Sequence, residues 1–142
     1  MSSPPEMVDL VAQAELSQAK ARYCRLLDTK DWLAVAELMT EGIIVDLDAG
    51  NPSSVPIVGR ENVLSAFQSS VADARTVHQV HSPEFEFVDD EARVIWAVQE
   101  RVVWQNGTSL TAFGHYHDRW IRLDGHWRIV ELRLEHLIMD FA

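Results

Sequence analysis

The first half of the chain has the hydrophobic spacing of helices. Between residues 7 and 27, apolar side chains recur every three or four positions and form one stripe on a predicted helix. The segment Asp28-Thr29-Lys30-Asp31 then offers capping groups, and a later segment rich in proline and serine predicts a loop. The elements predicted for this half are helices at 7–27, 32–39 and from 59 to about 71, a strand at 42–48 and the loop at 49–58.

The second half alternates between apolar and polar residues, as strands do. Four long strands are predicted, at 76–88, 91–104, 109–123 and 126–139. The breaks between them include Asn106-Gly107 and Asp124-Gly125, which are the strongest short signals for hairpins. The pattern therefore predicts an antiparallel meander of long strands that must curl, in an α+β fold whose helices cover the concave face.

Glu100 interrupts the apolar face of the second long strand. The side chains of that face are Ala92, Val94, Trp96, Val98, Glu100, Val102 and Trp104. A carboxylate on the buried face of a sheet is costly unless it is paired or protonated. We therefore expect Glu100 to face a pocket and to be used there.

Other polar side chains could join that carboxylate. Tyr23 lies in the apolar stripe of the first helix, where its hydroxyl either bonds a group of the core or serves a site. Asp28 ends that helix, and a cap for the next helix and a functional role are both open. His78 and His81 point to opposite faces of one strand unless Pro83 marks a bulge that shifts the alternation. The alternation alone leaves open which histidine faces the pocket, and either could be purely structural.

A second group of polar residues crowds the third long strand. His115 and His117 share one face, while Tyr116 and Asp118 share the other. Two histidines on one strand face could bind a metal with a third ligand, but the rest of the sequence supplies no clear ligand set. We therefore predict no metal site.

Composition and charge restrict the partners. The chain has 142 residues and a formal net charge of −10, so nucleic-acid backbones and acidic membrane surfaces are excluded as partners. Cys24 is the single cysteine, so no internal disulfide is expected. Residues 1–6 are expected to form a flexible tail without the features of a signal peptide, and no apolar run has the length of a membrane span. We predict one cytoplasmic domain over residues 1–142.

The motifs that are missing restrict the chemistry. The sequence contains no GxSxG, P-loop, GxGxxG or CxxC motif. What remains is proton transfer without a cofactor, or simple binding of a ligand. An imidazole hydrogen-bonded to a carboxylate is a workable general base near neutral pH, and a tyrosine hydroxyl can stabilise an enolate oxygen.

The chain resembles the nuclear transport factor 2-like superfamily in its SnoaL-like branch, and within it scytalone dehydratase and the bile-acid 7α-dehydratase. The segments that carry the resemblance are 21–32, 78–84, 114–118 and 124–129, and the similarity extends roughly from Val8 to Met139. It implies a cone-shaped α+β barrel, in which a strongly curved antiparallel sheet surrounds a pocket capped by about three N-terminal helices.

The resemblance also implies roles for individual residues. In the bile-acid dehydratase pattern, a helix tyrosine is followed five residues later by an aspartate, as Tyr23 is by Asp28. The strand histidine of the family corresponds to His78 and not to His81. The acidic residue of the next strand falls at or near Glu100, where an aspartate is usual. Scytalone dehydratase has a second histidine on that strand, and this chain has none there.

The leading hypothesis is a cofactor-independent dehydratase (a lyase) or isomerase that acts on a hydrophobic cyclic carbonyl or hydroxy compound. His78, oriented by Asp28, would remove a proton next to the carbonyl, and Tyr23 would bond the developing enolate oxygen. Glu100 would protonate a leaving hydroxyl with a pKa raised by the apolar pocket, hold the ligand, or pair with a neighbour such as Arg133. The residues expected to bind the substrate are Trp96, Val98, Trp104, Phe113, His115 and Tyr116.

Two other functions stay open at this stage. The same fold could serve as a non-catalytic binding or assembly domain, and Asp28 with Glu100 could position water for epoxide hydrolysis. Five tryptophans and long strands with open faces favour a homo-oligomer, which relatives imply to be a dimer or a trimer.

Overall fold

The computed structural model describes residues 6–142. Residues 1–5, part of the expected flexible tail without signal-peptide features, lie outside the described part. The helices are α1 (Met7–Asp28), α2 (Trp32–Glu37) and α3 (Arg60–Val71). The strands are β1 (Met39–Asp46), β2 (Ile57–Val58), β3 (Arg75–Val88), β4 (Glu91–Val103), β5 (Ser109–Leu123) and β6 (His126–Phe141). These bounds confirm the predicted helices and long strands, except that Met39 begins β1 and the predicted loop contains β2.

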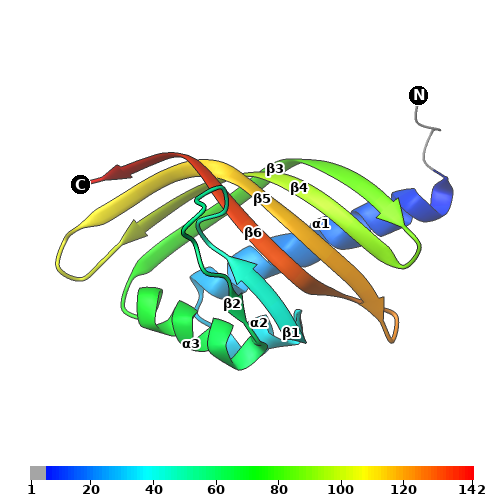
Figure 1. The fold of residues 1–142 in the computed structure, drawn as a ribbon, viewed down its shortest axis with the longest axis horizontal. Coiled ribbons are helices and arrows are strands. Elements are labelled where there is room, and N and C mark those ends of the chain that lie inside the picture. Colours follow the sequence, from blue (N-terminus) through cyan, green and yellow to red (C-terminus); the bar gives the residue numbers. More distant parts are fainter. Residues whose placement is uncertain (1–5) are drawn as a thin grey trace.

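All six strands form one curved sheet that does not close. The strand order is β2-β1-β6-β5-β4-β3, and β3 to β6 form the expected antiparallel meander. The pairing of β1 with β6 is parallel, so the sheet is mixed, which the strand pattern did not predict. The helices lie on one side of the arched sheet, where α1 packs against β3 and α3 against β1 (Figure 1). None of the helices within residues 6–142 is long and apolar enough to cross a membrane.

The hairpin turns have the backbone conformations that their residues favour. Asp124 and Gly125 join β5 to β6 with φ angles of 52° and 77°, as a tight turn with two left-handed residues requires. Gly107 joins β4 to β5 with a φ of 89°. Both predicted hairpins are therefore confirmed.

A β-bulge in β3 settles which histidine faces inward. The register between β3 and β4 shifts between His81 and Glu84, and Ser82 has a φ of 52°. His78 pairs with Glu100 before the bulge, and Phe85 pairs with Val94 after it, so both lie on the concave face. His81 is exposed on the convex face. The predicted phase shift at Pro83 is confirmed.

A second bulge brings β6 close to β5. The register shifts between Phe113 and Gly114, and Gly114 lies opposite His136. A Cβ atom at Gly114 would lie 1.9 Å from the carbonyl oxygen of Glu135, so only glycine allows this approach. The bulge leaves His136 on the concave face, in phase with Leu134.

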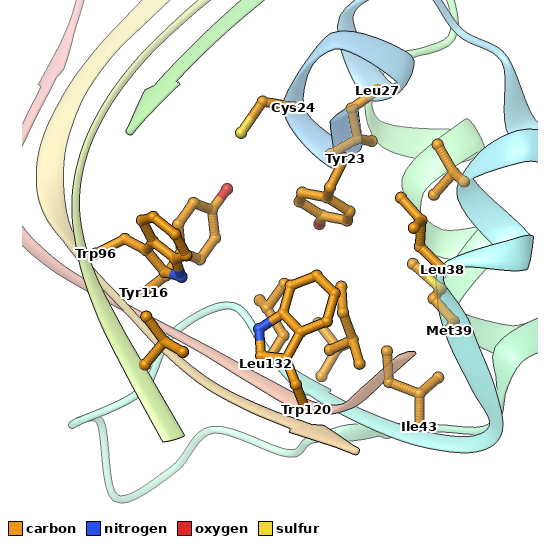
Figure 2. Packing of buried hydrophobic residues seen from close by; sticks show 14 of the residues in the cluster. Tyr23, Cys24, Leu27, Leu38, Met39, Ile43, Trp96, Tyr116, Trp120 and Leu132 are labelled. Carbon is orange, nitrogen blue, oxygen red and sulfur yellow. The ribbon is translucent and has the colours of Figure 1, made fainter. Parts of the chain in front are cut away.

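The core between sheet and helices contains a fully buried ion pair. Trp96, Tyr116 and Trp120 from the sheet face Tyr23 of α1 across the core (Figure 2). The Lys20 ammonium lies 2.9 Å from Oδ2 of Asp118, and both side chains are inaccessible to solvent. The indole N–H groups of Trp96 and Trp120 donate to the same oxygen at 3.1 Å each.

Candidate active site

His78 is held against Asp28 by two hydrogen bonds. Its Nδ1 lies 2.7 Å from Oδ1 of Asp28, and its backbone N–H donates to Oδ2 at 2.9 Å. An ionised carboxylate only accepts hydrogen bonds, so Nδ1 carries a proton and Nε2 is the nitrogen directed toward the inside of the sheet. This is the imidazole–carboxylate contact expected of a general base.

Asp28 is fixed by its position at the end of α1. The hydroxyl of Thr76 donates to Oδ1 of Asp28 at 2.9 Å, and the Lys30 ammonium donates to that hydroxyl at 2.9 Å. The N-cap of α2 is Asp31, whose side chain accepts from the backbone N–H of Ala34. Asp28 therefore does not cap α2, and its carboxylate serves the strand that carries His78.

Glu100 bridges two histidines. Its Oε2 lies 3.3 Å from Nε2 of His78, and its Oε1 accepts from Nε2 of His136 at 2.6 Å. The Glu100 side chain is 9% exposed. Arg133, considered as a partner from the sequence, lies on the convex face opposite His117 and does not contact Glu100. The expectation that Glu100 occupies an inward position with a partner thus holds, with imidazoles as the partners.

These contacts set the charges of the site. Burial lowers the pKa of His78, but hydrogen bonds to Asp28 and Glu100 outweigh burial and raise that pKa to about 9. Burial raises the pKa of Glu100, but hydrogen bonds from His136 and His78 outweigh it and lower that pKa to about 2. The expected raised pKa of Glu100 is therefore wrong, because the pocket supplies two imidazole donors. In the resting site, His78 is cationic and Glu100 is a carboxylate.

His136 was not foreseen from the sequence. It occupies a position like that of Glu100, since it continues the apolar face of β6 after Leu132 and Leu134. The signal that singled out Glu100, a polar residue in an alternating apolar row, was also present here. The shift between Arg119 and Trp120 obscured it, because it changes the phase of β6 between Ile129 and Glu131, before this row begins.

Two tyrosines complete the inner wall. Tyr23 and Tyr116 meet edge to face, with ring centroids 6.5 Å apart. Burial raises the pKa of both hydroxyls well above 10, so both remain protonated hydrogen-bond donors. The Lys20 ammonium lies 3.7 Å from the ring centroid of Tyr116 and 4.7 Å from that of Tyr23.

A half-open cavity of about 150 Å³ joins these groups. Its lining combines a polar wall with an apolar one. The polar residues are Tyr23, Ser70, His78, Glu100, Tyr116 and His136, and the apolar residues are Leu27, Leu47, Phe67, Val71, Val102 and Leu134. A cavity of this volume holds a single six-membered ring.

Of the residues expected to bind substrate, only Tyr116 lines this cavity. Phe113 and His115 point to the convex face, where they pair with Ile138 and Glu135 of β6, so their expected place in the pocket is wrong. Tyr116 faces inward, and strand alternation requires the opposite direction for its neighbour His115 and for Phe113.

The remaining expected residues face inward but do not line the cavity. Trp96 and Val98 are buried in the main core, where Trp96 packs edge to face on Phe85. Trp104 follows β4 and donates from its indole to the carbonyl of Ser70 at 3.0 Å. These three side chains support the core and α3 without lining the cavity.

Other hollows have a different character. One on the convex face is lined mainly by charged side chains such as Arg93, Arg119 and Glu131. Arg119 and Glu131 are already paired there at 3.0 Å. Within residues 6–142, no group of three His, Cys, Asp or Glu side chains is arranged to hold a metal ion. Among these hollows of residues 6–142, the cavity at His78 is where buried acid and base groups converge.

Comparison with known proteins identifies the class. The sequence profile of the SnoaL-like domain matches residues 8–133, and the chain belongs to this family. It is 26% identical over 139 residues to the probable cyclase FGR4 of Gibberella zeae, an alignment that covers 89% of this chain and 91% of that protein.

Solved structures show the same fold. A candidate scytalone dehydratase from Novosphingobium aromaticivorans superposes with a TM-score of 0.83 at 19% identity, covering 93% of this chain and 88% of that one. A type 2 hexachlorocyclohexane dehydrochlorinase (LinA) superposes with a TM-score of 0.81 at 16% identity, covering 94% and 90%. The expected nuclear transport factor 2-like, SnoaL-like architecture is thus confirmed.

Proposed function

We propose that this protein is a cofactor-independent enzyme of the lyase or isomerase type that eliminates water from, or isomerises, a small cyclic carbonyl compound. The observation that carries the proposal is the 2.7 Å contact between Asp28 and His78 at the wall of a partly apolar cavity. A domain that only binds ligands needs no such contact. The dehydrochlorinase, dehydratase and cyclase names of its relatives support the same class.

His78 is the base of this proposal. Asp28 holds Nδ1, so Nε2 is the atom that takes a proton from the carbon next to the carbonyl. The imidazole must be neutral at that moment, although it is cationic in the resting site. A ligand placed against Nε2 replaces the 3.3 Å contact with Glu100 and removes one of the hydrogen bonds that raise the pKa of His78. Binding of the ligand therefore favours the reactive form.

Tyr23 supplies the hydrogen bond to oxygen. Its side chain lines the cavity together with His78. Because the hydroxyl stays protonated, it can donate to a carbonyl oxygen and more strongly to the enolate that forms from it. Substrate oxygen near Tyr23 and substrate carbon near His78 define one orientation of the ring.

The test is turnover of small cyclic β-hydroxy ketones, followed by the ultraviolet absorbance of the enone product. We expect His78→Ala and Asp28→Asn to lower kcat/KM by about 10²- to 10⁴-fold, as for loss of a general base. Matched controls are His81→Ala, on the convex face of the same strand, and Asp31→Asn at the cap of α2. Wild-type rates in both site variants would refute the proposal.

Hydrolysis of an epoxide is less well supported. Asp28 and Glu100 do flank a basic group, His78, as such a mechanism requires. Both carboxylates are engaged by imidazole or hydroxyl donors, so neither is free to position water. Opening of cyclohexene oxide by the protein, without activity on hydroxy ketones, would favour that function instead.

A further inference from the structure

The cavity holds a second imidazole in direct contact with the site. His136 projects from β6, its side chain is 12% exposed, and its Nε2 lies 2.6 Å from Oε1 of Glu100. The other oxygen of the same carboxylate faces Nε2 of His78 at 3.3 Å. Asp28, His78, Glu100 and His136 thus form a continuous chain of titratable groups along one wall of the cavity.

We propose that His136 is a further catalytic residue, the acid that protonates the leaving hydroxyl, and that Glu100 carries the proton back from His78 to His136. This inference rests on the proposed function and assigns the half of the reaction that His78 does not perform. In this proposal the base and the acid are two histidines on different strands, His78 on β3 and His136 on β6, with the carboxylate of Glu100 between them.

The proton balance of the cycle closes without a co-reactant. Nε2 of His78 takes the proton from carbon, and the electron pair of that C–H bond becomes the new C=C bond. The C–O bond breaks, and its oxygen leaves with the bonding pair and the proton from His136, as water. Glu100 then accepts the proton of His78 on one oxygen and releases a proton to His136 from the other. The cycle begins, with the ligand bound, from a neutral His78 and a protonated His136, and each residue returns to that state.

The other polar groups of the cavity are poorer acids. Two imidazole donors keep Glu100 ionised, so it has no proton to give at the start. Tyr23 and Tyr116 have hydroxyls whose pKa burial raises, which makes them donors of hydrogen bonds and not of protons. Imidazole is the side chain that ordinarily gains and loses a proton near neutral pH. His136 is the cavity-lining group that fits the role.

A leaving group that needs no proton separates this role from a structural one. The substrates are a cyclic β-hydroxy ketone and the same ring with chloride in place of the hydroxyl, since chloride departs without protonation. The variant is His136→Gln, whose amide can still donate to Glu100 but cannot act as an acid. The control is His115→Gln, on the convex face of the neighbouring strand.

We expect His136→Gln to lower kcat on the hydroxy ketone about 100-fold, and kcat on the chloro ketone less than about tenfold. His78→Ala should lower both. Equal losses of His136→Gln on the two substrates, or no loss on the hydroxy ketone, would overturn the acid role.

A second measurement tests the bridge without turnover. The ¹⁵N resonances of the histidine side chains are followed through a pH titration in the wild type and in Glu100→Gln. The bridge predicts that this one substitution changes the titration of His78 and of His136 together. An unchanged His136 titration refutes the inference even if elimination occurs. A wild type that turns over neither ketone refutes the proposed function, and the titration still decides whether the bridge exists.

Discussion

His78 and Glu100 are direct cross-strand partners in β3 and β4, and Nε2 of His78 lies 3.3 Å from Oε2 of Glu100. Cross-strand neighbours on one face of a sheet are held at close range by the backbone, so this contact does not depend on a flexible loop. Asp28 approaches the same imidazole from the end of α1. The imidazole of His78 is therefore held between two carboxylates, that of Asp28 at the end of α1 and that of Glu100 on β4.

The first prediction concerns the pH dependence of kcat/KM. A base must be neutral to accept a proton, and the pKa of His78 in the free protein is raised to about 9. The part of the kcat/KM profile that His78 controls should therefore rise with pH up to about pH 9. Glu100→Gln removes one of the charges that raise this pKa, so the rising limb should move to lower pH. Initial rates from about pH 5 to about pH 10 measure both profiles. A rising limb that stays at the same pH in Glu100→Gln would contradict the assignment of this limb to the deprotonation of His78.

The second prediction concerns the free energy of unfolding. The raised pKa of His78 gives a stabilisation that is complete below its ordinary value of 6.5 and is lost as pH rises through about 9. The lowered pKa of Glu100 gives a stabilisation that is complete above its ordinary value of 4.5 and is lost as pH falls through about 2. The contribution of the pair should thus be greatest between pH 4.5 and 6.5. Urea unfolding followed from about pH 2 to about pH 9, across both flanks of this maximum, should show less pH dependence for Glu100→Gln than for the wild type.

The third prediction concerns the buried pair of Lys20 and Asp118. Lys20→Met leaves a buried carboxylate without its counter-charge and should lower the free energy of unfolding by about 3–5 kcal/mol. Adding Asp118→Asn removes that charge, while the amide oxygen can still accept from Trp96 and Trp120, so the double variant should recover much of the loss.

An exposed ion pair supplies the control for the variants of Lys20 and Asp118. Arg122 lies 3.3 Å from Glu15, with side chains 36% and 40% exposed. Arg122→Met should cost no more than about 1 kcal/mol, because solvent screens such a pair. Chemical denaturation measures all the variants. A double variant as unstable as Lys20→Met alone would show that the charge balance of the core is not the cause.

The strand and helix pattern was predictable because each element follows a local rule. Asn106-Gly107 and Asp124-Gly125 specify their turns by the φ angles that they tolerate, and the long strands lie between them. The parallel pairing of β1 with β6 was not predictable in this way, because no local feature of the 39–46 segment distinguishes a parallel partner from an antiparallel one.

The candidate site was predictable only in part, because a bulge changes which side chains share a face. Glu100 lies in a strand without a bulge, so alternation alone placed it on the concave face. His78 could be placed on the concave face only through the family resemblance, because the bulge after His81 shifts the alternation of side chains along β3. His136 lies between two irregularities in the pairing of β5 with β6, one before it at 129–131 and one after it at 136–138, and was missed. Phe113 was misplaced, although alternation along β5 already directs it away from the face of Tyr116; it lies on the convex face and is 40% exposed.

The last prediction concerns Gly114, which places His136. Gly114→Ala would put a methyl group 1.9 Å from the carbonyl oxygen of Glu135 and 2.9 Å from the Cα of His136, so β5 and β6 must separate. We expect the free energy of unfolding to fall by about 1–3 kcal/mol, as for overpacking at a site that cannot yield easily. Because the same shift carries His136 away from Glu100, the histidine ¹⁵N titrations should also change. Gly42→Ala is the matched control, since a Cβ there meets no atom within 4 Å. Wild-type stability in Gly114→Ala would mean that β6 can shift freely and does not hold His136 in place.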